Sequence, residues 1–361
     1  MRAAVLEEVG KPLFVTDVDL APPQRGEVRV KIGATGVCHS DLSLQNGTLP
    51  WPLPSVLGHE GAGIVAEVGQ DVRSVSVGDQ VVISWVPTCG GCFFCSHDQA
   101  HLCSKYRTLL GRMDDGKSRL SRGGTELWHG INAATFAEEA VLREQSVVKI
   151  PNDVPADIAA LIGCGVLTGV FAAINTAGVR AGERVAVIGC GGVGLNVVQG
   201  ARITGATTII AIDPIGSKRD AALRFGATHV CAPDEADALC LSLTDGIRPD
   251  AVFEVVGRAN LQRMAFDLVR PGGRAVMVGA APFTEAPAFP AAGFLFMEKK
   301  VLGCYYGSCN PRRDVPKIVQ MWRAGSLNLE DLVSQTLPLE GVNDAFAAIE
   351  AGTAIRTVLV P

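Results

Sequence analysis

Residues 183–214 read ERVAVIGCGGVGLNVVQGARITGATTIIAIDP, and this stretch decides the fold. The apolar run RVAVIG predicts a buried strand, and the run NVVQGARITGA after it predicts a helix. Between them, Gly189, Gly191 and Gly194 form G-x-G-x-x-G, and Asp213 follows Gly194 by 19 residues at the end of the next apolar run. Strand, glycine-rich turn, helix and acidic residue in this order predict a dinucleotide-binding βαβ unit.

Each member of this fingerprint has a physical task. Gly189 allows the tight turn, Gly191 lets a pyrophosphate approach the backbone, and Gly194 lets helix and strand pack closely. The helix N-terminus faces the phosphate charge. Asp213 is expected to accept hydrogen bonds from the adenosine ribose hydroxyls, which favours NAD over NADP, as does the lack of an arginine just after it. A glycine-rich turn of an ordinary α/β sheet, the alternative interpretation, would not require an acid at this offset.

The pattern outward from this stretch predicts an α/β protein with more than one domain. Across residues 166–304, apolar runs such as AVFEVVG and RAVMVG alternate with helical stretches, which predicts a doubly wound parallel Rossmann sheet. Residues 1–165 hold short alternating runs separated by Gly, Pro and Asp, which predict a β-rich domain. Residues 305–361 are expected to return to that first domain, with a helix in DVPKIVQMWRAG and a strand in RTVLVP.

Composition excludes several classes of partner. The 361 residues carry a formal net charge of −5 without a basic run, so neither nucleic acid nor an anionic membrane is an expected partner. The N-terminal residues MRAAVLEEVG lack the apolar region of a signal peptide, and we expect a cytoplasmic protein. The uncharged run 158–179 is long enough to span a bilayer, but its glycines and polar residues favour a buried core helix.

Four of the eleven cysteines are clustered in CGGCFFCSHDQAHLC, residues 89–103. Cys89, Cys92, Cys95 and Cys103 have the spacing C-x2-C-x2-C-x7-C, which can close a tetrahedral structural zinc site. An iron–sulfur cluster is the main alternative, since it too is commonly held by four cysteines. The absence of a Cys-Pro pair after this stretch favours zinc.

A second set of possible ligands is scattered along the chain. Cys38 lies in GVCHSDLS, His59 in LGHEGAG and Cys164 in LIGCGVLTG. A lone cysteine or histidine in such surroundings is more often a core residue than a ligand. Together, however, two cysteines and one histidine would leave a fourth zinc position open, which is typical of a catalytic site.

These motifs together resemble the zinc-containing alcohol dehydrogenases of the medium-chain dehydrogenase/reductase superfamily. The resemblance extends from VCHSDLS to IRTVLVP and includes EVVGR and GSCNPRRDVPKIV. It implies a GroES-like fold for the β-rich domain, two zinc ions per chain (one catalytic, one structural), NAD as cofactor, a small-molecule alcohol or aldehyde as substrate, and a homodimer joined along the edge strand predicted in KKVLGCYYG.

The resemblance also implies roles for single residues. Cys38, His59 and Cys164 match the catalytic zinc ligands, Glu60 the acid behind the metal, Asp41 the carboxylate that orients the histidine, and Ser40 the hydroxyl that takes the alcohol proton. Trp85 matches a bulky residue of the substrate pocket. Further positions match contacts to the cofactor: Thr168, Gly192, Val193, Lys218, His39 and Arg356.

Three departures from the family pattern concern the pocket. The histidine that usually ends the proton relay is replaced by Ser43. Arg107 matches a glutathione-binding arginine of the formaldehyde dehydrogenase branch, but Leu49 and Trp51 lie near the positions of that branch's acidic residues. The polar segment 104–130, which is either functional or an unrecognised element, is slightly shorter than its counterpart there.

The implied activity is therefore hydride transfer between a primary alcohol, or its aldehyde, and NAD, with zinc as a Lewis acid. Trp85, Trp51, Leu110 and Phe294 suggest an apolar pocket. Four alternatives stand beside it: an alcohol dehydrogenase that never releases its NAD, a glutathione-dependent formaldehyde dehydrogenase, a zinc-free reductase and a non-catalytic relative. The complete ligand set argues against the last two.

Overall fold

The structure is a computed structural model that describes residues 1–108 and 110–361; Leu109, within segment 104–130, lies outside the described residues. It divides into two compact units, Met1–Gly165 with Asn310–Pro361, and Val166–Cys309. The second unit therefore extends past residue 304 to Cys309. Each unit is described by itself.

The first unit is built mainly of strands, as its short alternating runs predict. One sheet has the order β2-β1-β5-β9-β8-β3, and the other has the order β11-β7-β6-β4-β19-β18, with β10 also paired to β4. The strands are β1 (Arg2–Leu6), β2 (Phe14–Asp17), β3 (Asp19–Leu20), β4 (Glu27–Val37), β5 (Ser55–Val56), β6 (Glu60–Val68), β7 (Gln80–Ile83), β8 (Leu120–Arg122), β9 (Thr125–His129), β10 (Glu139–Arg143), β11 (Val147–Ile150), β18 (Val333–Pro338) and β19 (Arg356–Val360).

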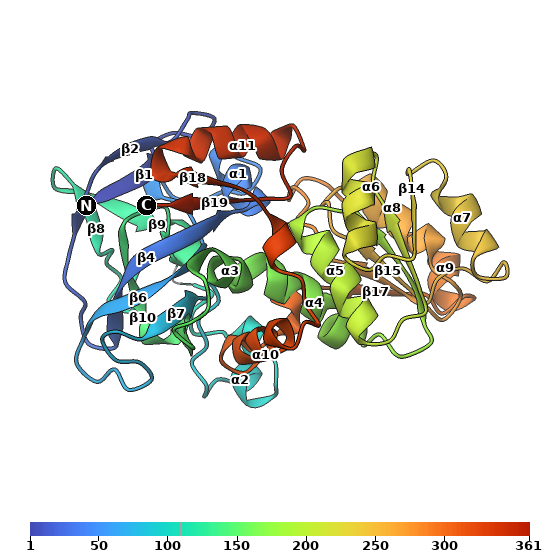
Figure 1. Ribbon diagram of the computed structural model, residues 1–361, viewed down its shortest axis with the longest axis horizontal. Helices are drawn as coiled ribbons and strands as arrows, with labels where there is room; N and C mark the ends of the chain where they lie inside the picture. The colour runs from blue at the N-terminus through green and yellow to red at the C-terminus, as the bar shows by residue number, and fades with distance from the viewer. Residues whose placement is uncertain (109) are drawn as a thin grey trace. The chain divides into compact units, whose positions relative to one another are not determined.

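The long strand β4 organises this unit. Its buried side chains Val28, Val30 and Ile32 pack with Val81 and Ile83 of β7 in one apolar core. Its C-terminal end pairs with β19, so a blue strand from the start of the chain and a red strand from its end lie side by side in Figure 1. The helices of this unit are α1 (His39–Gln45), α2 (Phe93–Ser96), α3 (Ala156–Leu161), α10 (Pro311–Arg323) and α11 (Val342–Glu350).

Segment 104–130 contains two short antiparallel strands, β8 and β9, and Arg119, which directly precedes β8, is buried and forms two charge pairs. The guanidinium of Arg119 is 5% exposed and donates to Glu27 at 2.7 Å and to Asp115 at 2.9 Å. Strands this short, with polar residues, have almost no hydrophobic periodicity. The segment is thus an unrecognised structural element rather than a free loop.

The second unit is a six-stranded parallel sheet in the order β14-β13-β12-β15-β16-β17, the doubly wound arrangement. Gly194 lies so close to the strand end that an added Cβ would be 1.8 Å from the carbonyl oxygen of Gly189. Only glycine fits there, as the fingerprint predicts. The strands are β12 (Arg184–Ile188), β13 (Thr208–Ile212), β14 (His229–Cys231), β15 (Ala251–Glu254), β16 (Arg274–Met277) and β17 (Lys300–Gly303).

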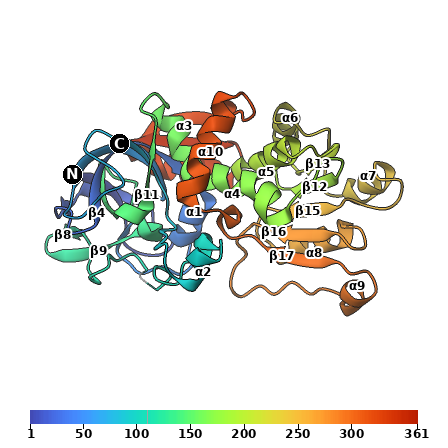
Figure 2. The same cartoon turned by 90° about the horizontal axis from the view of Figure 1, so that it is seen from below.

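Helices connect these strands, and Figure 2 shows the last of them, α9, at the end of a long connection at the margin of the unit. The helices are α4 (Leu167–Phe171), α5 (Gly192–Ile203), α6 (Gly216–Arg224), α7 (Ala236–Ser242), α8 (Ala259–Leu268) and α9 (Ala291–Leu295). The helical stretch Ala156–Ala177 is long and apolar enough to cross a membrane by composition, yet 89% of its most apolar window is buried in the protein. Core helices of soluble proteins pass the same test, so this stretch is weak evidence for a membrane span.

Candidate functional site: two clusters of metal ligands

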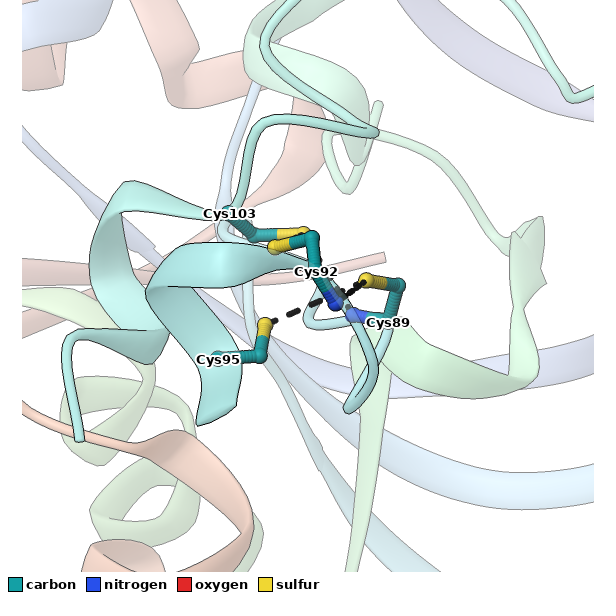
Figure 3. Close-up of side chains that lie close together, drawn as sticks. All are labelled: Cys89, Cys92, Cys95 and Cys103. Atoms are coloured by element: carbon teal, nitrogen blue, oxygen red, sulfur yellow. Dashed lines mark hydrogen bonds between the residues drawn. The ribbon is translucent and has the colours of Figure 1, made fainter. Parts of the chain in front are cut away.

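Four cysteine side chains converge in the segment that contains α2 (Figure 3). Cys92 immediately precedes α2, Cys95 lies within it, and Cys89 and Cys103 come from the chain on either side. The sulfur atoms of Cys89 and Cys95 are 4.0 Å apart, and those of Cys92 and Cys103 are 3.9 Å apart. Tetrahedral zinc with Zn–S bonds of about 2.3 Å places its sulfurs roughly 3.8 Å from one another. The geometry therefore fits a closed zinc site.

Backbone N–H groups point at two of these sulfurs and favour their thiolate form, whereas burial raises the pKa of the Cys95 thiol to about 12. The N–H of Cys92 donates to Cys89 Sγ at 3.3 Å, and the N–H of Cys89 donates to Cys103 Sγ at 3.4 Å. The backbone N–H of Cys95 helps to lower the pKa of the Cys92 thiol to about 5. A thiolate is the form that binds a metal.

The scattered ligands also meet, in the interior of the first unit. One ligand atom each of Cys38, His59, Glu60 and Cys164 lies within 4.8 Å of the others, and all four residues are buried. Cys38 follows β4, His59 precedes β6, and Glu60 begins β6.

Cys164 lies where the helix after α3 widens into a π-type turn, Ile162–Val166. Such turns are frequent at functional sites. The neighbouring Gly163 lets this turn approach β7, since an added Cβ would be 2.4 Å from the carbonyl oxygen of Ile83. The glycines in LIGCG thus let the helix bring a sulfur atom to the other ligands.

Asp41, on α1 and 0% exposed, ties two of the ligand segments together. Its Oδ1 accepts the backbone N–H of Gly58 at 3.1 Å and lies 3.0 Å from His59 Nδ1. Because a carboxylate only accepts, Nδ1 carries the proton and Nε2 is left free for a metal. Its other oxygen is 3.4 Å from the backbone N of Cys38.

The charges of the buried cluster suit a cation. The S–H of Cys164 donates to Cys38 and, against the effect of burial, this bond holds the pKa of the Cys38 thiol well below its usual value. Glu60 pairs through Oε2 with Arg356 of β19. Its Oε1 is buried without a hydrogen-bond partner among residues 1–108 and 110–361. Arg356 balances the charge of Glu60, but the buried Oε1 has no donor of its own among these residues, which is costly unless a cation contacts it. Together with two thiols and an imidazole, this oxygen fits a bound zinc ion.

The other site residues predicted from the sequence lie at different distances from this cluster. Ser40 Oγ lies 3.8 Å from Cys38 Sγ. The Trp85 ring stands edge-on to His59, with ring centroids 6.0 Å apart. Ser43 is partly exposed on α1, and His39 is exposed at its start.

The residues near the glutathione-binding positions have a different environment. Leu49 and Trp51 pack against an apolar core cluster, and Arg107 is exposed. Apolar side chains cannot form an ion pair with the amino group of glutathione, as the residue types at these positions predict.

In the second unit, Asp213 follows β13 and stands beside the glycine turn. Its Oδ2 accepts the N–H of Cys190 at 2.8 Å, and its Oδ1 accepts the N–H of Ile215 at 2.9 Å. Arg219 of α6 donates to the backbone oxygen of Asp213 at 2.8 Å. This guanidinium is absent from the residues directly after Asp213 in the sequence, and the first turns of α6 bring it back to the strand end.

The remaining expected cofactor contacts lie in different parts of the fold. Gly192, Val193 and Lys218 lie in the first turns of α5 and α6. Thr168 is in α4, where it is 9% exposed. Arg356 belongs to the first unit, where it pairs with Glu60. The two residues are 296 positions apart in the sequence, and no local pattern indicates that they pair.

Comparisons with known proteins cover almost all of the chain. A family described as alcohol dehydrogenase GroES-like domain matches residues 24–152, and one described as zinc-binding dehydrogenase matches residues 192–323. An NDMA-dependent alcohol dehydrogenase from Amycolatopsis methanolica is 40% identical over 99% of this chain and 98% of its own length. An S-(hydroxymethyl)glutathione dehydrogenase from Synechocystis sp. is 41% identical over 99% of both chains.

Solved structures agree with these relatives. An alcohol dehydrogenase zinc-binding domain protein from Burkholderia ambifaria superposes with a TM-score of 0.94 at 34% identity, covering 100% of this chain and 98% of that one. Benzyl alcohol dehydrogenase from Acinetobacter calcoaceticus superposes with the same TM-score at 30% identity, covering 99% and 98%.

Proposed function

Because the chain belongs to the zinc-dependent medium-chain alcohol dehydrogenases, we propose that Cys38, His59 and Cys164 hold the catalytic zinc at which a primary alcohol is oxidised. The observation that carries this proposal is the convergence of these three buried side chains within 4.8 Å. Two thiolates and one imidazole leave a fourth position for substrate. When bound, zinc would act as a Lewis acid toward the alcohol oxygen, and NAD would accept the hydride.

The chain's own residues position and deprotonate the substrate. Asp41 holds the His59 tautomer that frees Nε2 for the metal. The hydroxyl of Ser40, beside Cys38, accepts the proton of the alcohol and passes its own proton on toward the cofactor's ribose hydroxyl and solvent. Arg356 balances the charge of Glu60, so this carboxylate adds little net negative charge to the site. The Trp85 ring beside His59 forms an apolar wall for the substrate's carbon chain.

A second zinc belongs to Cys89, Cys92, Cys95 and Cys103 in this proposal, as a structural ion. The spacing of their sulfur atoms supports zinc, and four thiolates without an open position are typical of structural sites. Metal analysis should therefore give two zinc ions per chain. One zinc, or iron with visible absorption, would contradict this assignment.

The preferred cofactor is NAD. The Asp213 carboxylate at the end of β13 would repel a 2′-phosphate and accept ribose hydroxyls. Arg219 offers a counter-charge, but its Nη1 donates to the backbone oxygens of Asp213 and Pro214, which holds the side chain against the strand end. kcat/KM should be much higher with NAD than with NADP, and Asp213→Gly should narrow the difference.

The substrate is a primary alcohol without a glutathione group. Leu49 and Trp51 are apolar where glutathione would need an acidic partner, and the similarity to benzyl alcohol dehydrogenase supports an apolar substrate. A panel of aliphatic and aromatic alcohols, with and without glutathione plus formaldehyde, tests this. Activity confined to the glutathione adduct would overturn it.

The similarity to an NDMA-dependent enzyme favours one second candidate, an enzyme that retains its NAD. Absorbance and mass of protein purified without added NAD distinguish the two. NAD that stays bound through dialysis, with turnover only when an external acceptor is added, would establish this second candidate.

The functional assembly we propose is a homodimer joined along β17. This strand ends its sheet among the described residues, and Val301 and Leu302 are partly exposed on it. Nearby, Leu295 and Phe296 are 74% and 82% exposed. A bare apolar edge invites association. Light scattering should give twice the chain mass of 37.8 kDa, and a tetramer would overturn the proposal.

A further inference from the structure

A segment outside both ligand clusters lies against the turn that carries His59. The N–H of Thr135 donates to the carbonyl of Gly58 at 3.0 Å, and the N–H of Phe136 donates to the carbonyl of Leu57 at 3.0 Å. These two bonds fix the peptide groups that immediately precede the histidine. The position of His59 therefore depends on where the segment Gly130–Phe136 lies.

The same segment also contacts the strand that leads to Cys38. The hydroxyl groups of Thr35, on β4, and Thr135 are 2.7 Å apart, and both residues are 0% exposed. Thr35 lies three residues before Cys38. Thr135 thus touches both ligand-bearing segments, one through its backbone and the other through its side chain.

The backbone before Thr135 is strained. Ile131, Asn132 and Ala134 have φ values of 44°, 61° and 57°, a conformation that residues with a Cβ rarely adopt. Such strain costs about 1–3 kcal/mol per residue and persists only where the surroundings enforce it. Asn132 Oδ1 accepts the N–H of Gly111 at 2.9 Å, which holds the turn from the other side. Strain of this kind clusters at functional sites.

We propose that Thr135 is a positioning residue, whose hydroxyl contact with Thr35 acts beside the direct pairing of β4 with β6 to fine-tune the spacing between Cys38 and His59 and hence the zinc affinity of the buried cluster. The inference rests on the proposed function, because it requires zinc at that cluster. Metal–ligand distances tolerate deviations of only about 0.2 Å. A small shift of β4 relative to the turn at Gly58 is therefore enough to weaken binding.

The test measures zinc affinity by competition with a chromophoric chelator. The wild-type chain should show two binding phases, and the phase missing from Cys164→Ser belongs to the buried cluster. For that phase, Thr135→Val should raise Kd about tenfold, a loss typical of residues outside the ligand shell. Thr135→Ser keeps the hydroxyl and should stay within about twofold.

A double variant separates positioning from stability. Thr135→Val alone leaves the Thr35 hydroxyl buried without its partner, whereas Thr35→Val with Thr135→Val removes both groups and should recover most of the lost unfolding free energy. The zinc Kd should nevertheless stay raised, because the hydroxyl contact that fine-tunes the spacing of the two segments is gone. If Thr135→Val does not fold, Thr35→Val replaces it as the single variant.

The matched control is Thr244→Val. Thr244 is equally buried, and its hydroxyl donates to the carbonyl of Cys240 at 2.6 Å in the other unit. It should lose stability without a change in zinc Kd. An unchanged Kd in Thr135→Val, or a Kd that recovers together with stability in the double variant, would overturn the inference. A wild-type chain without the Cys164-dependent phase would instead contradict the proposed function.

Discussion

The two ligand clusters differ in how their residues are distributed in sequence and in space. The ligands of the lobe, Cys89–Cys103, come from one short segment and are mostly partly exposed. The ligands of the buried cluster come from the end of β4, the start of β6 and a helical turn far along the chain, and all are buried. A local cluster can form wherever its own segment folds, whereas a dispersed one can form only once the whole unit has folded.

This difference predicts different consequences when a ligand is lost. A structural site contributes to the folding free energy. A catalytic metal site with an open ligand position, inside a core that is already folded, contributes mainly to the reaction rate. The following variants test that division.

The largest expected effect follows from Cys164→Ser. Turnover should fall by about 10⁴-fold or more, since Lewis-acid stabilisation is worth several kcal/mol and each 1.36 kcal/mol is a factor of ten. Zinc content should drop from two to one per chain, and urea unfolding should remain close to wild type. Initial rates with a primary alcohol and metal analysis are the measurements. Retained turnover at one zinc per chain would place the chemistry elsewhere.

Cys92→Ser should have the opposite profile. We expect the free energy of unfolding to fall by about 4 kcal/mol or more, because a bound structural metal is lost. The folded fraction should still turn over alcohol. Cys304→Ser is the matched control, since Cys304 is also partly exposed but belongs to neither cluster. If Cys92→Ser and Cys304→Ser unfold alike, the lobe does not bind a structural metal.

The buried cluster is where the sequence was least informative on its own. The lobe spacing predicts its own geometry, and the glycine fingerprint predicts the parallel sheet. Taken one at a time, Cys38, His59 and Cys164 do not indicate a metal site, and only the family resemblance identifies them as one ligand set. The pairing of Arg356 with Glu60 and the contact of Thr35 with Thr135 depend on strand pairing between distant segments, which hydrophobic periodicity does not encode. Segment 104–130, expected to be either functional or an unrecognised element, contains β8 and β9, and these strands are too short and polar to show hydrophobic alternation.

Ser40→Ala sharpens the comparison within the buried cluster. It should leave zinc content and stability unchanged but lower kcat/KM by roughly 10²–10⁴-fold, the usual value of general acid–base help. Steady-state kinetics in alcohol oxidation measure the loss. Ser40→Thr, which keeps a hydroxyl, is the control and should retain far more activity. Equal losses in both variants would indicate that the proton leaves by another route.

The smallest effect is expected at Ser43, which we propose lies at the far end of the same proton path. Serine has no pKa near neutrality, whereas histidine titrates near 6.5 and accepts a proton above that pH. Ser43→His should therefore raise oxidation rates a few-fold below about pH 8 and do little at higher pH. A pH–rate profile with a deuterated alcohol shows whether chemistry limits the rate. Suppose that chemistry limits the rate and that Ser43→His leaves the low-pH limb of the profile unchanged. If His39→Gln shifts that limb, His39 carries the proton instead.

The pairing of β19 with β4 has a consequence for the order of events during synthesis. All strands of the nucleotide unit lie between Val166 and Cys309, so that unit is complete before β18 and β19 leave the ribosome. Until then the end of β4 that pairs with Thr357–Leu359 remains an open edge. Arg356, which arrives with β19, is the partner of Glu60. The metal-binding interior, whose first ligands are made early, is therefore the last part of the molecule to be finished.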